Sequence, residues 1–456
     1  MTLNRRQFMQ TTAAAVVLPK LGWASYPALV AQEAMQQIAP EGFSETRVWT
    51  YGGQVPGPEI RVPQGARVQR RLSNTLPQPT TVHWHGIRID NAMDGVPGLT
   101  QDVVQPGSSF DYDFEVPDAG TYWYHAHNRS MEQIARGLYG PLIVEEAVAP
   151  DVDRDLTLML DDWRLDSETA QIMDDFGNGH DLSHAGRLGN LVSVNGRFDP
   201  AYSVGGGERL RLRLINASNA RIFDLGLDGL TGWIVALDGM PLEVPLEVSD
   251  RFPLAPAQRV DLIVDVRAAP SGIANLVSFE RDGSYGLVRF DVSGKSKTAR
   301  TGITPLVPNQ MPEVLLEDVP LKQMAMQGGA MRWLESAKIG ENVLSGQELA
   351  QLGRFWALNG NAERPAEPFL DVQKGTTYRI EFVNETAFPH AMHLHGHHFR
   401  LILEDGTLGP WRDTVLVERG QTRQIALVAD NPGDWLLHCH MLGHAASGMM
   451  SWFRVT

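Results

Sequence analysis

The segment His438-Cys439-His440-Met441-Leu442-Gly443-His444-Ala445-Ala446-Ser447-Gly448-Met449-Met450 decides the fold class and the chemistry of this chain. It contains the only cysteine among 456 residues, with a histidine on each side and a third four residues later. The preceding residues 434–437 are typical of a buried strand, in which successive side chains point to opposite faces. We therefore expect Cys439 to face one way and both flanking histidines the other, so that one backbone segment joins two metal centres. The simpler alternative is a core cysteine beside surface histidines, because free cysteine is commonly buried.

The composition indicates a large globular protein. The length predicts about three domains of roughly 150 residues each. Hydrophobic residues make up 43% and charged residues 20%, a balance that can fill sizeable cores. The formal net charge of -15 argues against nucleic acid or an anionic membrane as a partner. A single cysteine excludes a disulfide within the chain, so Cys439 is either incidental or committed to one special task.

The first residues resemble an export signal. Arg5 and Arg6 precede an apolar run over residues 11–18, which is too short to span a bilayer. A twin arginine before such a run is typical of a Tat signal, and the alternative is a basic start without fixed structure. We expect a Tat-type signal region over residues 1–34, cleavage between about Ala24 and Ala34, and a periplasmic protein. No later stretch is long and apolar enough for a transmembrane helix.

The body of the chain has the pattern of short β-strands. Residues 110–116 alternate apolar and acidic side chains, and residues 210–214 alternate leucine and arginine, as half-buried strands do. The 44 glycines and 28 prolines divide the chain into short segments, which suits β-sandwiches. Helical periodicity is weak apart from one segment near residues 331–352.

A segment that occurs three times indicates three related domains. Gly65–Asn74, Gly207–Asn216 and Gly375–Asn384 each combine a turn glycine, an alternating strand and a closing asparagine. We therefore predict an all-β fold of three β-sandwich domains over residues 40–148, 149–295 and 340–456. A linker over residues 296–339 separates the last two, because its beginning is rich in Lys, Thr and Pro.

Paired histidines occur in the first and third predicted domains. The four pairs are His83-Trp84-His85, His125-Ala126-His127, His393-Leu394-His395 and His438-Cys439-His440. Gly120 precedes the second pair by the same five residues that separate Gly433 from the fourth. The middle domain contains no such pair. A pseudo-symmetric interface between the outer domains could therefore gather eight imidazoles.

The available ligand types favour copper. Two histidines, a thiolate and a weakly bound methionine are typical of a blue copper site, and the chain supplies His390, Cys439, His444 and Met449. The spacing favours Met449 over its neighbour Met450. The eight paired histidines fit a polynuclear copper cluster, whereas a structural zinc needs only four ligands. Of the 14 histidines, four are left for structural or surface positions: His180, His184, His397 and His398.

These motifs resemble the multicopper oxidases, in their bacterial laccase-like, three-domain form. His-x-His-Gly, His-x-His, His-x-x-His-x-His and His-Cys-His-x₃-His-x₄-Met occur in this order, and the resemblance covers essentially the whole chain after the signal. It implies three cupredoxin-like Greek-key sandwiches and four copper ions.

The resemblance also implies a role for each ligand. Type 1 copper would be held by His390, Cys439, His444 and Met449. Type 2 copper would be held by His83 and His393. The binuclear type 3 pair would have one copper on His85, His125 and His440, and the other on His127, His395 and His438.

The activity implied by the resemblance is one-electron oxidation of a small substrate, coupled to the four-electron reduction of O₂ to water. His444, at the surface, would receive the electrons, and Cys439 would connect the type 1 site to the flanking histidines. Asp94 stands where the family carries a carboxylate that assists near the cluster, so it is the candidate proton relay. Ala445 departs from many bacterial relatives, which have a carboxylate there, and leaves the other relay group without a candidate.

We favour phenols or aromatic amines as substrates. Cuprous oxidases of the family carry a methionine-rich insert, because thioethers select Cu(I). Here only Met311, Met324, Met326 and Met331 are candidates, and methionines at such spacing commonly fill cores. Oxidation of Cu(I) or Mn(II) is the second hypothesis. A copper-free cell-envelope scaffold is the third, although that role predicts missing ligands and none is missing. We expect a monomer.

Overall fold

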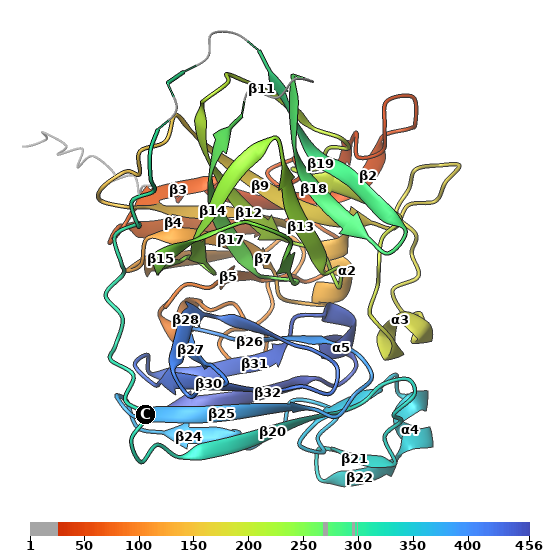
Figure 1. The fold of residues 1–456 in the computed structure, drawn as a ribbon. Helices are drawn as coiled ribbons and strands as arrows, with labels where there is room; N and C mark the ends of the chain where they lie inside the picture. Colours follow the sequence, from red (N-terminus) through yellow and green to blue (C-terminus); the bar gives the residue numbers. More distant parts are fainter. Residues whose placement is uncertain (1–25, 268–271, 294–296, 299) are drawn as a thin grey trace, which may run out of the picture.

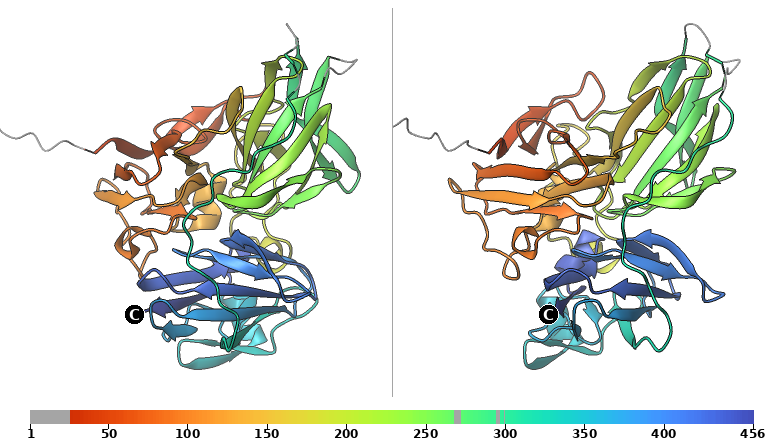
Figure 2. Two further views of the ribbon diagram at one scale, coloured as in Figure 1. Left: turned by 60° about the vertical axis from the view of Figure 1, so that its left-hand side comes forward. Right: turned by 90° about the vertical axis from the view of Figure 1, so that its left-hand side faces the viewer.

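The computed structural model describes residues 26–456 apart from 268–271, 294–296 and 299. This part of the chain folds into three β-sandwiches, which confirms the predicted all-β class. Figure 1 shows the first and second sandwiches, in red-orange and green, above the third, in blue. In Figure 2 the three lobes meet around a common centre, so the third sandwich lies against both of the others. No helix in the described part is long and apolar enough to cross a membrane.

The first sandwich consists of two four-stranded sheets. Its strands are β1 (Ala28–Gln36), β2 (Thr46–Tyr51), β3 (Ile60–Pro63), β4 (Arg67–Asn74), β5 (Val82–His85), β6 (Ser109–Glu115), β7 (Gly120–Ala126) and β8 (Tyr139–Glu145). They form sheets in the orders β2-β1-β4-β6 and β3-β8-β7-β5. The short helices η1 (Asn91–Met93) and α2 (Ser130–Ala135) follow β5 and β7.

The first strand overlaps the segment predicted as an export signal. β1 pairs with both β2 and β4, and Leu29 and Ala31 belong to the core. The folded domain therefore begins before residue 34, and a cut near Ala34 would remove most of β1. The twin arginine and the apolar run lie outside the described residues.

The second sandwich has a six-stranded and a five-stranded sheet. Its strands are β9 (Arg154–Trp163), β10 (Leu191–Val194), β11 (Ala201–Val204), β12 (Arg209–Asn216), β13 (Phe223–Asp228), β14 (Leu230–Leu237), β15 (Met240–Glu247), β16 (Phe252–Leu254), β17 (Arg259–Val266), β18 (Ile273–Glu280) and β19 (Gly283–Val292). The sheet orders are β10-β9-β12-β17-β14-β15 and β11-β19-β18-β13-β16. Helix α3 (Gly179–Ser183) lies in the long connection between β9 and β10.

Strand β12 differs from the half-buried strand that its pattern predicts. All eight residues are buried. The leucines enter the core of the second sandwich, and the arginines lie at the boundary with the first. Arg211 pairs with Asp261 at 2.6 Å, and Arg213 donates to the Thr121 hydroxyl at 2.9 Å. Both faces can be buried because carboxylates of neighbouring strands and a hydroxyl of the first sandwich pair with the guanidinium groups.

The third sandwich carries most of the remaining strands. These are β20 (Leu321–Gly328), β21 (Ser336–Ile339), β22 (Asn342–Ser345), β23 (Trp356–Leu358), β24 (Leu370–Val372), β25 (Thr377–Asn384), β26 (His390–Leu394), β27 (Phe399–Ile402), β28 (Leu408–Arg412), β29 (Thr414–Val417), β30 (Thr422–Val428), β31 (Gly433–Cys439) and β32 (Met450–Val455). The main sheets have the orders β23-β20-β25-β30-β27-β28 and β24-β32-β31-β26-β29. Helices α4 (Gly346–Gln351) and α5 (Leu442–Ala446) are short.

The segment predicted as a linker is partly folded into the third sandwich. β20 pairs in parallel with β25, so the sandwich begins at Leu321, and the described residues 300–320 before it contain no strand. The earlier part of the connection runs along the outside of the molecule (Figure 1), where Leu306 packs on Val235 and Ile263 of the second sandwich.

The helix predicted near residues 331–352 is wrong for most of its length. Only α4 is helical, and the hairpin β21–β22 occupies residues 336–345. The helix begins where Ser345 and Glu348 form a capping box, in which each side chain bonds to the other residue's backbone N–H. Apolar residues before that point pack as a two-stranded unit, a long-range pairing that local periodicity does not indicate.

The closing asparagine of each repeat has the same structural role. Asn74, Asn216 and Asn384 end β4, β12 and β25, and all three are buried. Each side-chain oxygen accepts from the backbone N–H two residues later, at 3.0, 3.0 and 2.9 Å. Each amide donates to a carbonyl of the following loop and to one more than 29 residues on, the latter at 2.9, 2.8 and 3.1 Å. The asparagine therefore ties two loops to the end of its strand.

We expect replacement of Asn216 by Ala to lower the free energy of unfolding by about 2–4 kcal/mol, because several buried backbone groups lose their partners. Urea unfolding of the copper-free protein measures this change. The matched control is Asn342→Ala, at an exposed position in the β21–β22 hairpin, which we expect to change stability by less than about 0.5 kcal/mol. Equal effects of the two substitutions would contradict the assigned role.

Candidate metal centres

Strand β31 and helix α5 bring the opening segment between two groups of metal-ligating side chains. β31 pairs with β26 in a register that places Cys439 opposite Met392 and His438 opposite His393. The Cys439 sulfur faces His390, with 3.6 Å between Sγ and Nδ1. The His438 ring points to the other side, where its Nε2 lies 3.2 Å from Nε2 of His395. The alternation predicted from strand geometry is thus present in the structure.

The first group contains one thiol and two imidazoles. Nδ1 of His390 and Nδ1 of His444 lie 3.6 and 3.7 Å from the Cys439 sulfur and 3.0 Å from each other. Met449 is fully buried, and its carbonyl accepts a 3.1 Å hydrogen bond from the Cys439 N–H. Met450 instead pairs with His438 at the start of β32. The structure thus brings together three of the four residues predicted as type 1 ligands, and a backbone hydrogen bond keeps Met449 next to Cys439.

Hydrogen bonds at the outer nitrogens orient both imidazoles of this group. Nε2 of His390 lies 2.7 Å from the Thr386 hydroxyl, and Nε2 of His444 lies 2.7 Å from the carbonyl oxygen of His184. Because the carbonyl can only accept, His444 donates through Nε2, and its Nδ1 carries the lone pair that faces Cys439. The site is therefore preorganised for a metal ion by groups that do not bind it.

His444 is not at the surface, in contrast to the sequence expectation. Its side chain is 0% exposed, because the segment after α3 covers Nε2 and the Trp356 ring packs on its face with 4.3 Å between centroids. The segment comes from the second sandwich, more than 250 residues earlier in the chain. The local sequence around His444 does not predict this burial, because the covering segment is distant in the chain.

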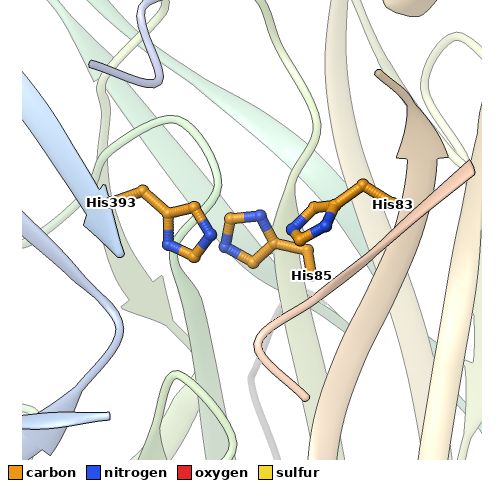
Figure 3. A group of neighbouring side chains, drawn as sticks. All are labelled: His83, His85 and His393. Carbon is orange, nitrogen blue, oxygen red and sulfur yellow. The ribbon is translucent and has the colours of Figure 1, made fainter. Parts of the chain in front are cut away.

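The second group contains the eight paired histidines. They form overlapping triplets whose ligand atoms lie within 4.8 Å of one another: His83, His85 and His393; His85, His125 and His440; and His127, His395 and His438. Figure 3 shows His83 and His85 from the first sandwich converging with His393 from the third. The last two triplets contain the same residues as the two implied type 3 sets, and the first contains His85 in addition to the implied type 2 pair His83 and His393. The outer domains thus bring the eight paired histidines together, as the paired motifs predicted.

The cluster fits metal ions because it leaves ring nitrogens without protein partners. Backbone carbonyls accept from Nδ1 of His83, His125, His393 and His438 at 2.9–3.1 Å. Five buried nitrogens make no hydrogen bond among the described residues: Nε2 of His83, His127 and His393, and Nδ1 of His85 and His440. A buried polar atom without a partner lowers the stability of the folded protein. Five such nitrogens in one cluster indicate that a bound group, which is not part of the protein chain, is their partner. Imidazole donors with no carboxylate among the three triplets suit copper.

Two buried aspartates support the cluster. Asp94 lies with Oδ2 at 2.9 Å from Nδ1 of His395 and Oδ1 at 3.1 Å from Nδ1 of His83. Asp413 lies with Oδ1 at 3.3 Å from Nε2 of His85, and its carbonyl accepts from His393. Asp94 was a sequence candidate and is placed as expected. Asp413, which directly precedes strand β29 in the third domain, is not among the site residues predicted from the sequence.

Arg259 from the second sandwich compensates the charge of Asp413. The fully buried guanidinium donates to Oδ1 of Asp413 at 2.9 Å and to Oδ2 at 2.5 Å, and its Nε donates to the Thr121 carbonyl at 3.1 Å. Burial raises the pKa of Asp413, but Arg259 and His85 outweigh it, so the pKa is held well below its usual range. The arginine thus contacts the first and third sandwiches at once. Its position beside the cluster could not be inferred from its local sequence.

A cavity of about 590 Å³ leads toward the cluster from the side of α2 and α5. His127 and His438 line it, as does Ala445, the position without the acid expected in many relatives. Glu132 is the only acidic side chain among the described residues that line it. Its carboxylate pairs with Arg129 at 2.8 Å and Arg136 at 3.0 Å. Glu132 is not among the site residues predicted from the sequence.

Burial keeps the ligands in their uncharged forms when no metal is present. It raises the pKa of the Cys439 thiol to about 12 and lowers the pKa of His444 to about 4. Burial and the neighbouring His393 lower the pKa of His438 to about 3. Neutral imidazole is the form that binds metal, whereas the thiol must lose its proton to do so.

The four histidines outside the ligand sets fall into two pairs. His397 and His398 are buried. Nε2 of His398 lies 3.7 Å from the Asp413 carboxylate, and Nδ1 of His397 lies 3.3 Å from the His395 carbonyl, so both contact residues of the cluster or its supports. His180 is exposed and His184 half-buried, and their rings stack with 3.9 Å between centroids. Both pairs agree with the structural or surface positions expected from the sequence.

Comparison with known proteins identifies the class. Three multicopper oxidase profiles match residues 32–148, 154–274 and 340–456. "Multicopper oxidase MmcO" of Mycobacterium tuberculosis is 32% identical over 88% of this chain and 81% of its own length. "Laccase-2" of Botryotinia fuckeliana is 29% identical over 91% of this chain and 80% of its own length. The crystal structure of Lac15 from a marine microbial metagenome is 43% identical, covers 94% of this chain and 100% of its own, and has a TM-score of 0.77.

The fold and the two ligand clusters define an oxidoreductase built from cupredoxin-like domains. The chain belongs to the multicopper oxidase family. It is therefore an enzyme with copper cofactors that oxidises a reducing substrate with O₂.

Replacing Arg259 by Met leaves the Asp413 carboxylate buried without its cation. We expect the free energy of unfolding to fall by about 3–5 kcal/mol and bound copper to decrease, since Asp413 orients two ligands of the cluster. Urea unfolding and copper analysis measure the two effects. The control is Arg454→Met, which breaks an ion pair with Asp434 whose side chains are 41% and 30% exposed, and should cost less than about 1 kcal/mol. Similar losses in both variants would contradict the importance of the buried pair.

The copper-free protein should lose stability as the pH falls from about 7 to about 5. The pKa of His444 is about 4 in the folded chain against 6.5 for an ordinary histidine, so the unfolded chain binds the extra proton in this range. Each such histidine lowers stability by about 1.4 kcal/mol per pH unit below 6.5. Calorimetric Tm values at the two pH values measure the loss, and the variant His444→Gln should show a smaller one. Equal Tm values for the unsubstituted protein would contradict neutral buried histidines.

Proposed function

We propose that this enzyme acts as a laccase, oxidising phenols or aromatic amines one electron at a time while O₂ is reduced to water. The observation that carries the proposal is the position of Cys439 between the two groups of ligands. Its sulfur lies 3.6 Å from His390, while the flanking His438 and His440 belong to the eight-histidine cluster. A short covalent path through one residue on either side thus connects the two groups.

The proposed ligand sets account for four copper ions. His390, Cys439, His444 and Met449 hold the type 1 ion, and His83 and His393 hold the type 2 ion. The type 3 pair is held by His85, His125 and His440 on one side and by His127, His395 and His438 on the other. When bound, copper supplies the redox chemistry that couples four one-electron oxidations to the reduction of one O₂.

The protein's own groups orient the ligands and handle protons. Thr386 and the His184 carbonyl fix the ring positions of His390 and His444. Asp94 is proposed as the proton relay, because its carboxylate reaches two ligand rings of the cluster at 2.9 and 3.1 Å. Reduction of O₂ consumes protons. A buried carboxylate within hydrogen-bond distance of the His83 and His395 rings is close enough to the cluster to deliver them.

The methionines support an organic reductant over Cu(I). Met324 and Met326 are 1% and 0% exposed and belong to the core shared by the first and third sandwiches. Their thioethers therefore fill space, as is common for methionine, and are not presented to a metal ion in solution. Met331 is 70% exposed, but one exposed thioether does not make the multidentate site that Cu(I) selectivity requires.

We also propose export to the periplasm through the Tat pathway and function as a monomer. Support for export comes from Arg5, Arg6 and the apolar run over residues 11–18. The scaffold alternative has no support, because none of the twelve proposed ligands is missing from the sequence and the eleven other than Met449 lie in compact groups.

Replacing Cys439 by Ser removes the thiolate that connects the two groups. We expect loss of the intense blue absorption, loss of one copper of four, and a fall in phenol-driven O₂ uptake of more than about a hundredfold. Absorption spectra, copper analysis and an oxygen electrode provide the three measurements.

The neighbouring methionines supply a matched control for the type 1 assignment. Met449→Leu should shift the blue absorption and raise the type 1 reduction potential, whereas Met450→Leu should leave both unchanged. An unsubstituted, copper-loaded protein that is colourless and consumes no O₂ with any phenol would contradict the proposed function.

A further inference from the structure

Hydrogen bonds to three consecutive backbone carbonyls hold a short segment of the second sandwich over the type 1 site. The Leu182 carbonyl accepts from Nε1 of Trp356 at 2.6 Å and from the Ser447 hydroxyl at 3.0 Å. The Ser183 carbonyl accepts from the N–H of Ala330 at 2.7 Å. The His184 carbonyl accepts from Nε2 of His444 at 2.7 Å. All the donors belong to the third sandwich, so α3 and the residue after it form a fixed cover.

This cover limits where a reductant can approach the type 1 site. His390, Cys439 and His444 are all 0% exposed, so a reductant in solution cannot touch the thiol or either imidazole. The outer nitrogen of His444 ends on the His184 backbone. A short route from the surface to the imidazole of His444 therefore crosses this hydrogen bond and the backbone of His184.

The surface of the cover presents two stacked imidazoles. The rings of His180 and His184 lie 3.9 Å apart at 12°, with His180 exposed. Nδ1 of His184 lies 3.1 Å from the His180 carbonyl and 3.0 Å from the Ser183 hydroxyl, which fixes the inner ring. Phe388 packs edge-on against His184 with 5.8 Å between centroids. The result is a rigid aromatic stack whose inner member carries the carbonyl bonded to His444.

We propose that His180 and His184 form the contact surface for an aromatic reductant, from which electrons reach the type 1 site through the His184 carbonyl and the N–H of His444. This inference rests on the proposed laccase function and specifies its substrate site. A planar phenol or aromatic amine stacks on the exposed imidazole face. The phenol loses one electron to the type 1 site and its hydroxyl proton to water, and leaves as a phenoxyl radical.

The ring geometry favours an aromatic molecule over a metal ion at this position. Nitrogen lone pairs lie in the plane of the imidazole ring. Two planes 3.9 Å apart and inclined by only 12° cannot direct their lone pairs to one ion without rotation, and Nδ1 of His184 is already hydrogen-bonded. Parallel faces, in contrast, suit a further stacked ring.

Steady-state kinetics with a phenol and with ferrocyanide test the inference in the copper-loaded enzyme. We expect His180→Ala to raise KM for the phenol by about three- to tenfold, the loss of one stacking contact, with little change in kcat. Ferrocyanide has no ring to stack, so its kinetics should not change. His184→Phe keeps an aromatic ring and should retain a KM for the phenol within about twofold of the unsubstituted value, whereas His184→Ala should not.

The control variant is Leu188→Ala, at an exposed position of the same connection. It should leave KM for both donors unchanged. The blue absorption must be the same in all variants, so that altered kinetics cannot be attributed to a damaged type 1 site.

A binding measurement provides a readout that does not depend on turnover. In the anaerobic, fully reduced enzyme, which is diamagnetic, carbon-13 NMR signals of labelled histidine rings are followed while the phenol is added. The two signals that disappear in His180→Ala and His184→Ala should shift, and the other twelve of the 14 should not.

The outcomes separate the two proposals. Phenol oxidation by the unsubstituted enzyme, with normal KM in His180→Ala and no shift of the two signals, overturns this inference and leaves the proposed function intact. Loss of ferrocyanide oxidation together with phenol oxidation in His180→Ala also overturns it. An unsubstituted enzyme that oxidises no phenol overturns the proposed function and this inference with it.

Discussion

The buried ion pair between Arg259 and Asp413 is the interaction on which the arrangement of the three sandwiches depends. Arg259 belongs to the second sandwich and Asp413 to the third, and the same guanidinium donates to the Thr121 carbonyl of the first. A charge buried at this depth is tolerated only when it is paired and fully hydrogen-bonded. The pair therefore favours one relative position of the domains, in which Asp413 reaches His85 and the histidines of the outer domains converge.

The middle domain supplies no ligand but completes both ligand groups. Besides Arg259, it contributes Asn219, whose side chain donates to the Met131 carbonyl and whose own carbonyl accepts from the N–H of Leu442. It also contributes the His184 carbonyl that orients His444. These contacts explain why a domain without paired histidines is part of the functional unit: it contacts both outer domains and covers the outer nitrogen of His444.

Local patterns correctly predicted the fold class and which side chains lie close together. The three repeats ending in Asn74, Asn216 and Asn384 correspond to equivalent strands, and the four histidine pairs lie in one compact cluster. Predictions failed where packing between distant segments decides the outcome. β1 and β20 lie in stretches assigned to a signal and a linker, because strand pairing with partners far along the chain is not visible in local composition.

The sequence by itself determined which residues could bind copper. It also determined that Cys439 and its flanking histidines point to opposite faces, since the period of two along β31 follows from backbone geometry alone. Only the tertiary structure decided the environment of those residues. The burial of His444 under the His184 segment and the support of the cluster by Asp413 and Arg259 arise from contacts between domains. Such contacts join residues more than 150 positions apart, and no local pattern encodes them.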